Sequence, residues 1–138
     1  MKVMVSACLL GTNCKYDGGN NRNEKLLHYI KGKEVVAVCP ELLGGLVAPR
    51  PPVELRSNRA INNLGEDVTV AFRSGAAAVL ALAKEEQPSL IILQARSPSC
   101  GVRRIYDGSF QHRLVPGSGI TAQLLKDAGF VVLDVEEL

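Results

Sequence analysis

The sequence has no tryptophan, few aromatic residues and no long apolar run. Aromatic residues make up 4% of its 138 residues, and the formal net charge is only +2. A nucleic-acid-binding surface usually needs more stacking groups and a clearer excess of positive charge. No segment approaches the ~20 apolar residues that span a bilayer, and the apolar start is too short for a signal peptide. We therefore expect a cytoplasmic protein with no membrane contact and no large nucleic-acid partner.

The sequence also lacks the common short cofactor motifs. Neither a dinucleotide-binding G-x-G-x-x-G after the first apolar run nor a phosphate-binding G-x-x-x-x-G-K-[ST] is present. The chain has 4 cysteines, none of them in the Cys-x-x-Cys spacing of zinc ribbons. Because thiols stay reduced in the cytoplasm, these cysteines need a role other than disulfide formation.

Two hydrophobic periodicities alternate along the chain. The near-continuous apolar runs at 2–7, 35–39, 90–93 and 130–135 are typical of strands that are buried on both faces. Helical patterns lie between them. They cover 23–31, 67–86 and 120–126. The order predicts one α/β domain over residues 1–138, with an open, mostly parallel, Rossmann-like sheet and helices on both faces.

Two long stretches, 40–66 and 95–119, do not follow this alternation. Both are rich in glycine and proline and also carry arginine, serine and cysteine or glutamate. Structureless loops longer than about 12–15 residues are uncommon in compact domains unless they are functional. We therefore predict that both stretches are site-forming loops.

The positions of the cysteines favour a common site. Cys8 and Cys39 end the first two predicted strands, and Cys100 follows the third by a short turn. In open α/β sheets, ligands bind beyond the carboxyl ends of the strands, so these three thiols should converge there. Cys14 lies in the loop after the first strand and could approach the same place. A single buried cysteine is more often a small core residue, but three at equivalent strand ends favour a binding site.

Convergent thiolates favour a soft metal centre, which could be zinc, copper(I) or an iron–sulfur cluster. Three cysteines with one open position would suit a cluster used for chemistry, whereas an electron-transfer cluster normally has four cysteines. The cysteine count alone leaves both arrangements open. We expect His28 to be a surface residue on a helix, and His112 could approach the site from its loop.

Polar residues accompany two of these cysteines. Glu41 lies two positions after Cys39, and a carboxylate beside a metal site can act as a general acid or base. Ser97 and Ser99 precede Cys100, where a hydroxyl could bind substrate or move a proton. Without such a role, Glu41 would be an exposed loop residue and the serines would belong to an ordinary serine-proline turn.

Arginines in or next to the two long stretches could form an anion-binding rim, although a solvated surface position is the commoner role for each. These arginines are Arg50, Arg96, Arg103 and Arg104.

Six sequence blocks together resemble the domain-of-unknown-function 523 (DUF523) family, which includes the thiouracil desulfidases. The blocks are 6–11 (SACLLG), 14–18 (CKYDG), 39–46 (CPELLGGL), 49–54 (PRPPVE), 97–101 (SPSCG) and 106–110 (YDGSF). They occur in the family's order and span nearly the whole chain. The resemblance implies an iron–sulfur enzyme that removes sulfur from a thiolated nucleobase such as thiouracil.

The resemblance also implies a set of site residues. Cys8, Cys39 and Cys100 match the three family cysteines that hold a [4Fe-4S] cluster, and the fourth iron is open to the substrate sulfur. Glu41 and Ser97 match the family's catalytic polar residues. Cys14 matches a family cysteine that we place beside the cluster rather than in it. Such an open cluster should be oxygen-labile and lost in air.

The implied reaction is hydrolysis of a C–S bond in a small thiolated base or nucleoside. Water attacks the carbon that carries sulfur, with Glu41 as general acid or base. Three other functions stay open at this point. The protein could be a metal-binding protein without catalysis, a sulfur or cluster carrier, or a modifier of thiolated nucleotides in RNA. The sequence does not indicate the oligomeric state.

Overall fold

The computed structural model describes every residue from Met1 to Leu138. Its elements in chain order are β1 (Lys2–Ser6), a 3-10 turn (Ala7–Leu10), α1 (Glu24–Tyr29), β2 (Glu34–Val38), α2 (Pro40–Leu43), β3 (Val53–Arg56), β4 (Arg59–Asn62), α3 (Thr69–Glu86), β5 (Leu90–Leu93), β6 (Arg104–Tyr106), β7 (Leu114–Pro116), α4 (Ile120–Asp127), β8 (Val132–Asp134) and a second 3-10 turn (Val135–Glu137). All the strands and helices predicted from periodicity are present, with ends that differ by a few residues.

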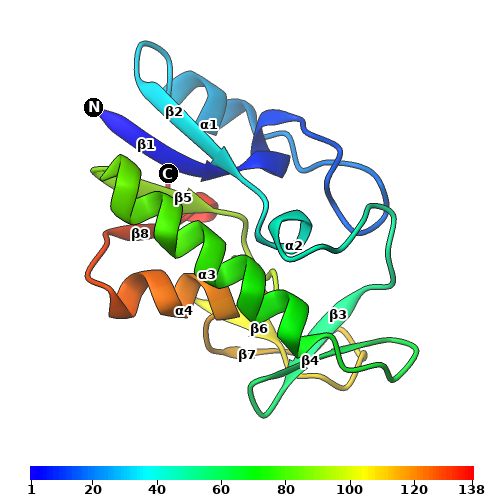
Figure 1. Cartoon of the computed structure of the whole chain (residues 1–138). Coiled ribbons are helices and arrows are strands. Elements are labelled where there is room, and N and C mark those ends of the chain that lie inside the picture. Colours follow the sequence, from blue (N-terminus) through cyan, green and yellow to red (C-terminus); the bar gives the residue numbers. More distant parts are fainter.

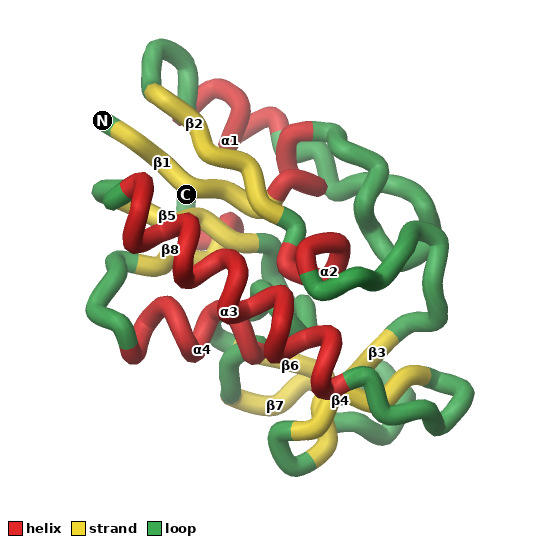
Figure 2. Tube along the Cα trace, viewed as in Figure 1, coloured by secondary structure: helices red, strands yellow, loops and turns green.

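The central sheet has four parallel strands in the order β2-β1-β5-β8 (Figure 2). Met4 of β1 pairs with Val36 of β2 on one side and with Ile91 of β5 on the other. The prediction of an open parallel sheet is therefore confirmed. The three strands that precede the predicted site cysteines are neighbours, so their carboxyl ends meet at one edge.

Helices cover both faces of this sheet, as the sequence predicted (Figure 1). Because side chains alternate along a strand, each strand contributes to two cores. Met4, Ile91 and Leu93 are fully buried beneath α3 and α4. Val3 and Ile92 point to the opposite face, where they pack with Leu26 of α1. Burial on both faces explains why the strand sequences are continuously apolar. None of the helices has the length and apolar character needed to cross a membrane.

The two long stretches are more ordered than the sequence predicted. Residues 40–66 contain α2 and the antiparallel hairpin β3–β4, and residues 95–119 contain the hairpin β6–β7. The β3–β4 hairpin turns at Ser57 and Asn58, which both have positive φ, and two such residues are typical of tight hairpin turns. Sequence reasoning missed the hairpins because their strands have only 3 or 4 residues.

Candidate functional site

A cavity of about 630 Å³ opens at the carboxyl ends of β1, β2 and β5. The last residues of β1 and β2, Ser6 and Val38, line it together with Gln94, which follows β5. Both long stretches contribute to its walls, as expected. All four cysteines line this one cavity. The fold therefore collects every thiol of the chain at the edge where parallel sheets usually bind ligands.

Each cysteine reaches the cavity from a different local structure. Cys8 lies in the 3-10 turn that follows β1, and Cys39 is the residue before the first turn of α2. Cys100 follows β5 through a turn and is 5% exposed. Cys14 comes from the loop after the 3-10 turn and is 2% exposed. All four thiols are free.

Cys14 lowers the pKa values of two other cysteines, and its backbone oxygen accepts from Cys39 Sγ at 3.9 Å. Hydrogen bonds with the Cys14 thiol lower the pKa of Cys8 to about 7 and the pKa of Cys39 to about 6. The same hydrogen bonds, first that with Cys39, raise the pKa of Cys14 itself. The amide of Asn21 also donates to Cys8 Sγ at 3.5 Å. Cys8 and Cys39 are therefore thiolate-prone, and thiolate is the form that binds metals.

Cys100 lies in a different environment. Burial raises the pKa of its thiol to about 12, while the hydroxyls of Ser6 and Ser99 act in the opposite direction. A buried thiol of this kind is unreactive on its own, and a bound metal would favour its deprotonation.

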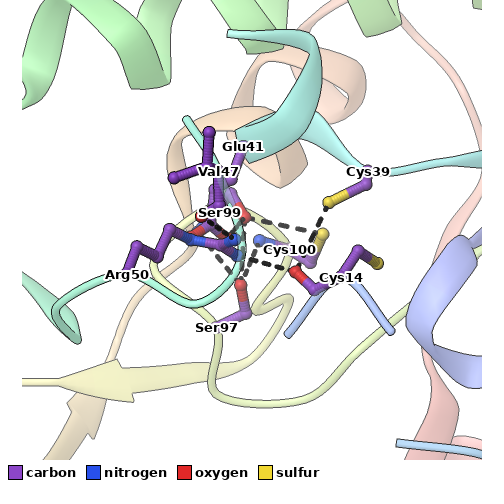
Figure 3. A network of polar contacts seen from close by, with 8 residues as sticks. All are labelled: Cys14, Cys39, Glu41, Val47, Arg50, Ser97, Ser99 and Cys100. Carbon is purple, nitrogen blue, oxygen red and sulfur yellow. Dashed lines mark hydrogen bonds and ion pairs between the residues drawn. The ribbon is translucent and has the colours of Figure 1, made fainter. Parts of the chain in front are cut away.

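Glu41 lies in the first turn of α2 and forms an ion pair with Arg50. Arg50 Nε lies 3.1 Å from Glu41 Oε1, and the two side chains are only 7% and 13% exposed, respectively (Figure 3). The guanidinium also donates to the carbonyl oxygens of Val47 at 3.0 Å and Cys14 at 2.9 Å. Arg50 thus holds Glu41 and the cysteine loop in a fixed relation.

Two serines complete the network around Glu41. Ser99 Oγ donates to Glu41 Oε2 at 2.9 Å and lies 3.0 Å from Ser97 Oγ (Figure 3). Ser97 Oγ also accepts from the backbone N–H groups of Ser99 at 3.2 Å and Cys100 at 3.0 Å. Glu41 and Ser97 both line the cavity, whereas Ser99 is 1% exposed and lies behind it.

The structure corrects the expected arginine rim. Arg50 is buried against Glu41, Arg96 pairs with Glu136 at 2.8 Å, and Arg103 pairs with Glu137 at 2.7 Å. Arg50 and Arg96 line the cavity, each paired with a carboxylate, whereas Arg103 and Arg104 do not line it, so the four arginines do not form one shared anion site. The contact between Arg50 and Glu41 was missed because no short motif joins residues that lie nine positions apart in an irregular segment.

Ring-bearing side chains form part of the cavity lining. They are Tyr16, Tyr106, Phe110 and His112. Glu54 holds the β6–β7 hairpin in place, because its Oε1 accepts from the N–H groups of Gly108 and Phe110 at 3.0 Å. His112 thus reaches the cavity, while His28 is exposed on α1, as expected.

The donor set suits a cluster better than a single ion. No three His, Cys, Asp or Glu side chains lie close enough together to hold one metal ion. In an iron–sulfur cubane, each cysteine binds a different iron, so its ligands are spread around a larger body. Four cysteines around one cavity match that need, and soft thiolates are the ligands that iron–sulfur clusters take.

Comparisons with known proteins show the family to which the chain belongs. The family model of the 2-thiouracil desulfurases matches residues 3–137. A curated relative, the uncharacterized protein YbbK of Bacillus subtilis (strain 168), is 42% identical over 99% of this chain and 97% of its own length. A solved structure, that of the [4Fe-4S]-dependent thiouracil desulfidase TudS, matches with a TM-score of 0.93 and 38% identity. That match covers 99% of this chain and 92% of the solved one. The chain belongs to the 2-thiouracil desulfurase family.

Proposed function

We propose that this protein is a [4Fe-4S]-dependent desulfidase that hydrolyses the C–S bond of a thiolated nucleobase such as thiouracil. In this reaction, a thiocarbonyl and water become a carbonyl and hydrogen sulfide, with no net electron transfer. The observation that carries the proposal is the convergence of the strand-end cysteines with Glu41 on one cavity. Family membership and the likeness to TudS support it.

Cys8, Cys39 and Cys100 are the residues that would hold the cluster. They come from the ends of three neighbouring strands and line one cavity. Cys14 lines the same cavity, and we assign it a place beside the cluster because it lies in the loop beyond the 3-10 turn, outside the set of cysteines that follow the sheet strands. When bound, such a cluster supplies an iron with an open position, which acts as a Lewis acid toward the substrate sulfur.

Glu41 and Ser97 would handle the protons and the substrate. Glu41 is held by Arg50, so its carboxylate has a defined orientation at the cavity wall. A carboxylate in that place can accept a proton from the attacking water and return it to the departing sulfide. Ser97 presents a hydroxyl to the same cavity and is fixed by two backbone N–H groups.

The lining and the volume of the cavity favour a small substrate with a flat ring. The lining includes aromatic rings, on which a pyrimidine ring can stack. Its volume of about 630 Å³ lies within the range of small-molecule sites. We therefore assign a thiolated base or nucleoside as the substrate. Because all four thiols are free and a reducing compartment keeps them so, we assign the cytoplasm as the place of action.

The proposal is tested by anaerobic reconstitution with iron and sulfide. We expect a broad absorption near ~400 nm with about four irons per chain, as soft thiolate ligation of a cubane predicts. The reconstituted protein should convert thiouracil to uracil and release one sulfide for each uracil. A colourless protein, or one that holds iron but releases no sulfide, would contradict the proposal. The second result would favour a cluster or sulfur carrier.

A further inference from the structure

Three asparagines lie close together in the segment between the first 3-10 turn and α1. They are Asn20, Asn21 and Asn23. The side chains of two of them serve the backbone. Asn20 Oδ1 accepts from the N–H of Arg22 at 3.0 Å, and Asn23 Oδ1 caps α1 by accepting from the N–H of Leu26 at 2.9 Å. The side chain of Asn21 caps no backbone group, so the local fold of the segment does not account for it.

The amide of Asn21 is directed at a cysteine sulfur. Its Nδ2 donates to Cys8 Sγ at 3.5 Å, which is a hydrogen-bonding distance for an acceptor as large as sulfur. The backbone N–H of Asn21 also donates to the carbonyl oxygen of Cys8 at 3.0 Å, and that of Asn23 donates to the carbonyl oxygen of Leu9 at 3.0 Å. These backbone hydrogen bonds join the two segments and hold the amide against the sulfur.

The direction of the bond from Asn21 to Cys8 suits a cysteine that binds a metal. A metal-bound cysteine is a thiolate, which has no proton and can only accept hydrogen bonds. Of the two ends of the Asn21 amide, only the NH₂ group can face such a sulfur, and this is the end that faces it. Hydrogen-bond partners of metal ligands fix the orientation of the ligand and tune the metal.

Asn21 also lies in the wall between two hollows. It lines the cysteine cavity, and it lines a more open hollow of about 390 Å³ beyond that cavity. Cys8 lines only the cysteine cavity. The open hollow is lined mainly by polar residues, so water enters it readily. The side chain of Asn21 therefore separates the Cys8 sulfur from solvent as well as donating to it.

We infer that Asn21 is a positioning residue for Cys8, whose sulfur its amide holds and supplies with a hydrogen bond when the cluster is bound. The inference rests on the proposed function for the identity of the bound group, and it adds a residue that acts through Cys8. Hydrogen bonds to the sulfurs and solvent exposure are among the factors that set the reduction potential of an iron–sulfur cluster. Reduction adds negative charge, so a donor at Cys8 favours the reduced form and makes the cluster harder to oxidise. The proposed reaction involves no net electron transfer, so a cluster that keeps its charge is what it requires.

The test compares reconstituted wild type with two variants that lose the donor and keep the approximate size of the side chain, Asn21→Leu and Asn21→Asp. Potentials are measured by anaerobic titration with dithionite, followed by EPR of the one-electron-reduced cluster. We expect both variants to show a more negative potential than wild type, and an iron affinity lower by about 10–100-fold. An unchanged potential in both variants overturns the inference.

Asn20→Leu is the matched control. Asn20 lines only the open hollow and is hydrogen-bonded to Asn13 and Arg22 rather than to a cysteine. We expect this variant to keep the wild-type potential and iron affinity. A shift in Asn20→Leu as large as that in Asn21→Leu overturns the inference, because the effect would then belong to the whole segment and not to the amide at Cys8.

A second measurement does not depend on the folding of any variant. Wild-type protein that contains asparagine labelled with ¹⁵N in the side-chain amide should show a ¹⁵N hyperfine coupling in pulsed EPR of the reduced cluster. Absence of that coupling overturns the inference. A wild-type protein that takes up no cluster overturns both the inference and the proposed function. A wild-type protein that shows the coupling but releases no sulfide from thiouracil overturns the proposed function alone.

Discussion

Gly44, which follows α2, and Gly75 of α3 lie directly against each other. A Cβ atom on Gly44 would overlap the carbonyl oxygen of Ala71, and one on Gly75 would overlap the carbonyl oxygen of Pro40. The two backbones therefore approach more closely than any side chain permits. This contact sets the position of α2, and with it the positions of Cys39 and Glu41 at the cavity.

Gly75→Ala should displace α2 and weaken cluster binding. Alanine usually stabilises a helix interior by about 0.5–1 kcal/mol relative to glycine. Here the overlap with a backbone carbonyl dominates, and overpacking of this kind typically costs about 1–3 kcal/mol. We expect lower stability in urea unfolding and less iron after reconstitution. Arg73→Ala, at an exposed position of the same helix, is the control and should keep the wild-type stability and iron content. Unchanged iron content in Gly75→Ala would show that this contact does not position Cys39.

The three strand-end cysteines and Cys14 should differ in their effect on iron binding. Replacing Cys8, Cys39 or Cys100 by serine should abolish the absorption near ~400 nm, because each removes one soft ligand. Cys14→Ser should keep about four irons per chain, because we place Cys14 beside the cluster. Iron and sulfide counts after anaerobic reconstitution give the measurement. Full iron content in any of the first three variants would exclude that residue as a ligand.

Glu41→Gln should separate chemistry from cluster binding. Glutamine has nearly the same shape and still accepts from Ser99, but it cannot take up a proton in the reaction. We expect an unchanged visible spectrum and a kcat that is lower by about 10²-fold or more. Glu85→Gln, at an exposed position of α3, serves as the matched control. Full activity of Glu41→Gln would remove this residue from the chemistry.

The ion pair of Arg50 and Glu41 should show strong coupling in stability. Removing one partner leaves a charge with little solvent access, which typically costs about 3–5 kcal/mol when the pair is buried. We expect Arg50→Met to be strongly destabilised in urea unfolding. The double variant Arg50→Met with Glu41→Gln should lose less free energy of unfolding than the two single variants lose together, because it has no unpaired charge. Simple additivity would indicate that the two side chains do not interact in solution.

Asp67 should make stability depend on acid pH. The guanidinium of Arg59 and then the hydroxyl and N–H of Thr69 hold the pKa of this carboxyl well below its usual range. A lowered folded-state pKa gives stability that is fully present above the unfolded pKa of ~3.9 and is lost progressively as the pH falls from there through the folded-state pKa. Asp67→Asn should thus be less stable than wild type at pH 6, and the difference should shrink toward pH 3. Thermal unfolding of both proteins at both pH values checks this. A difference between wild type and Asp67→Asn that is the same at pH 6 and pH 3 would contradict the prediction.

Local periodicity predicted the sheet and the main helices. Strands that are buried on both faces appear in the sequence as continuous apolar runs, and helices appear as apolar residues at helical spacing. Leu90–Leu93 is buried at every position, and α3 presents Phe72, Ala76 and Val79 on one buried stripe. The sequences of the hairpins β3–β4 and β6–β7 show no comparable apolar pattern. Their short strands are only partly buried and owe their pairing to contacts with distant residues, such as that of Glu54 with Gly108.

The amino-acid sequence was enough to predict the α/β layers and the placement of Cys8, Cys39 and Cys100 after three strands of the sheet. Both follow from the apolar pattern and from the geometry of parallel sheets, which are local properties of the chain. The folded structure was needed to show that Ser99 contacts Glu41 and that Arg50 is paired with Glu41 at the cavity wall. The contact with Ser99 joins residues 58 positions apart. Contacts of this kind depend on how irregular segments pack against the sheet, which no local pattern records.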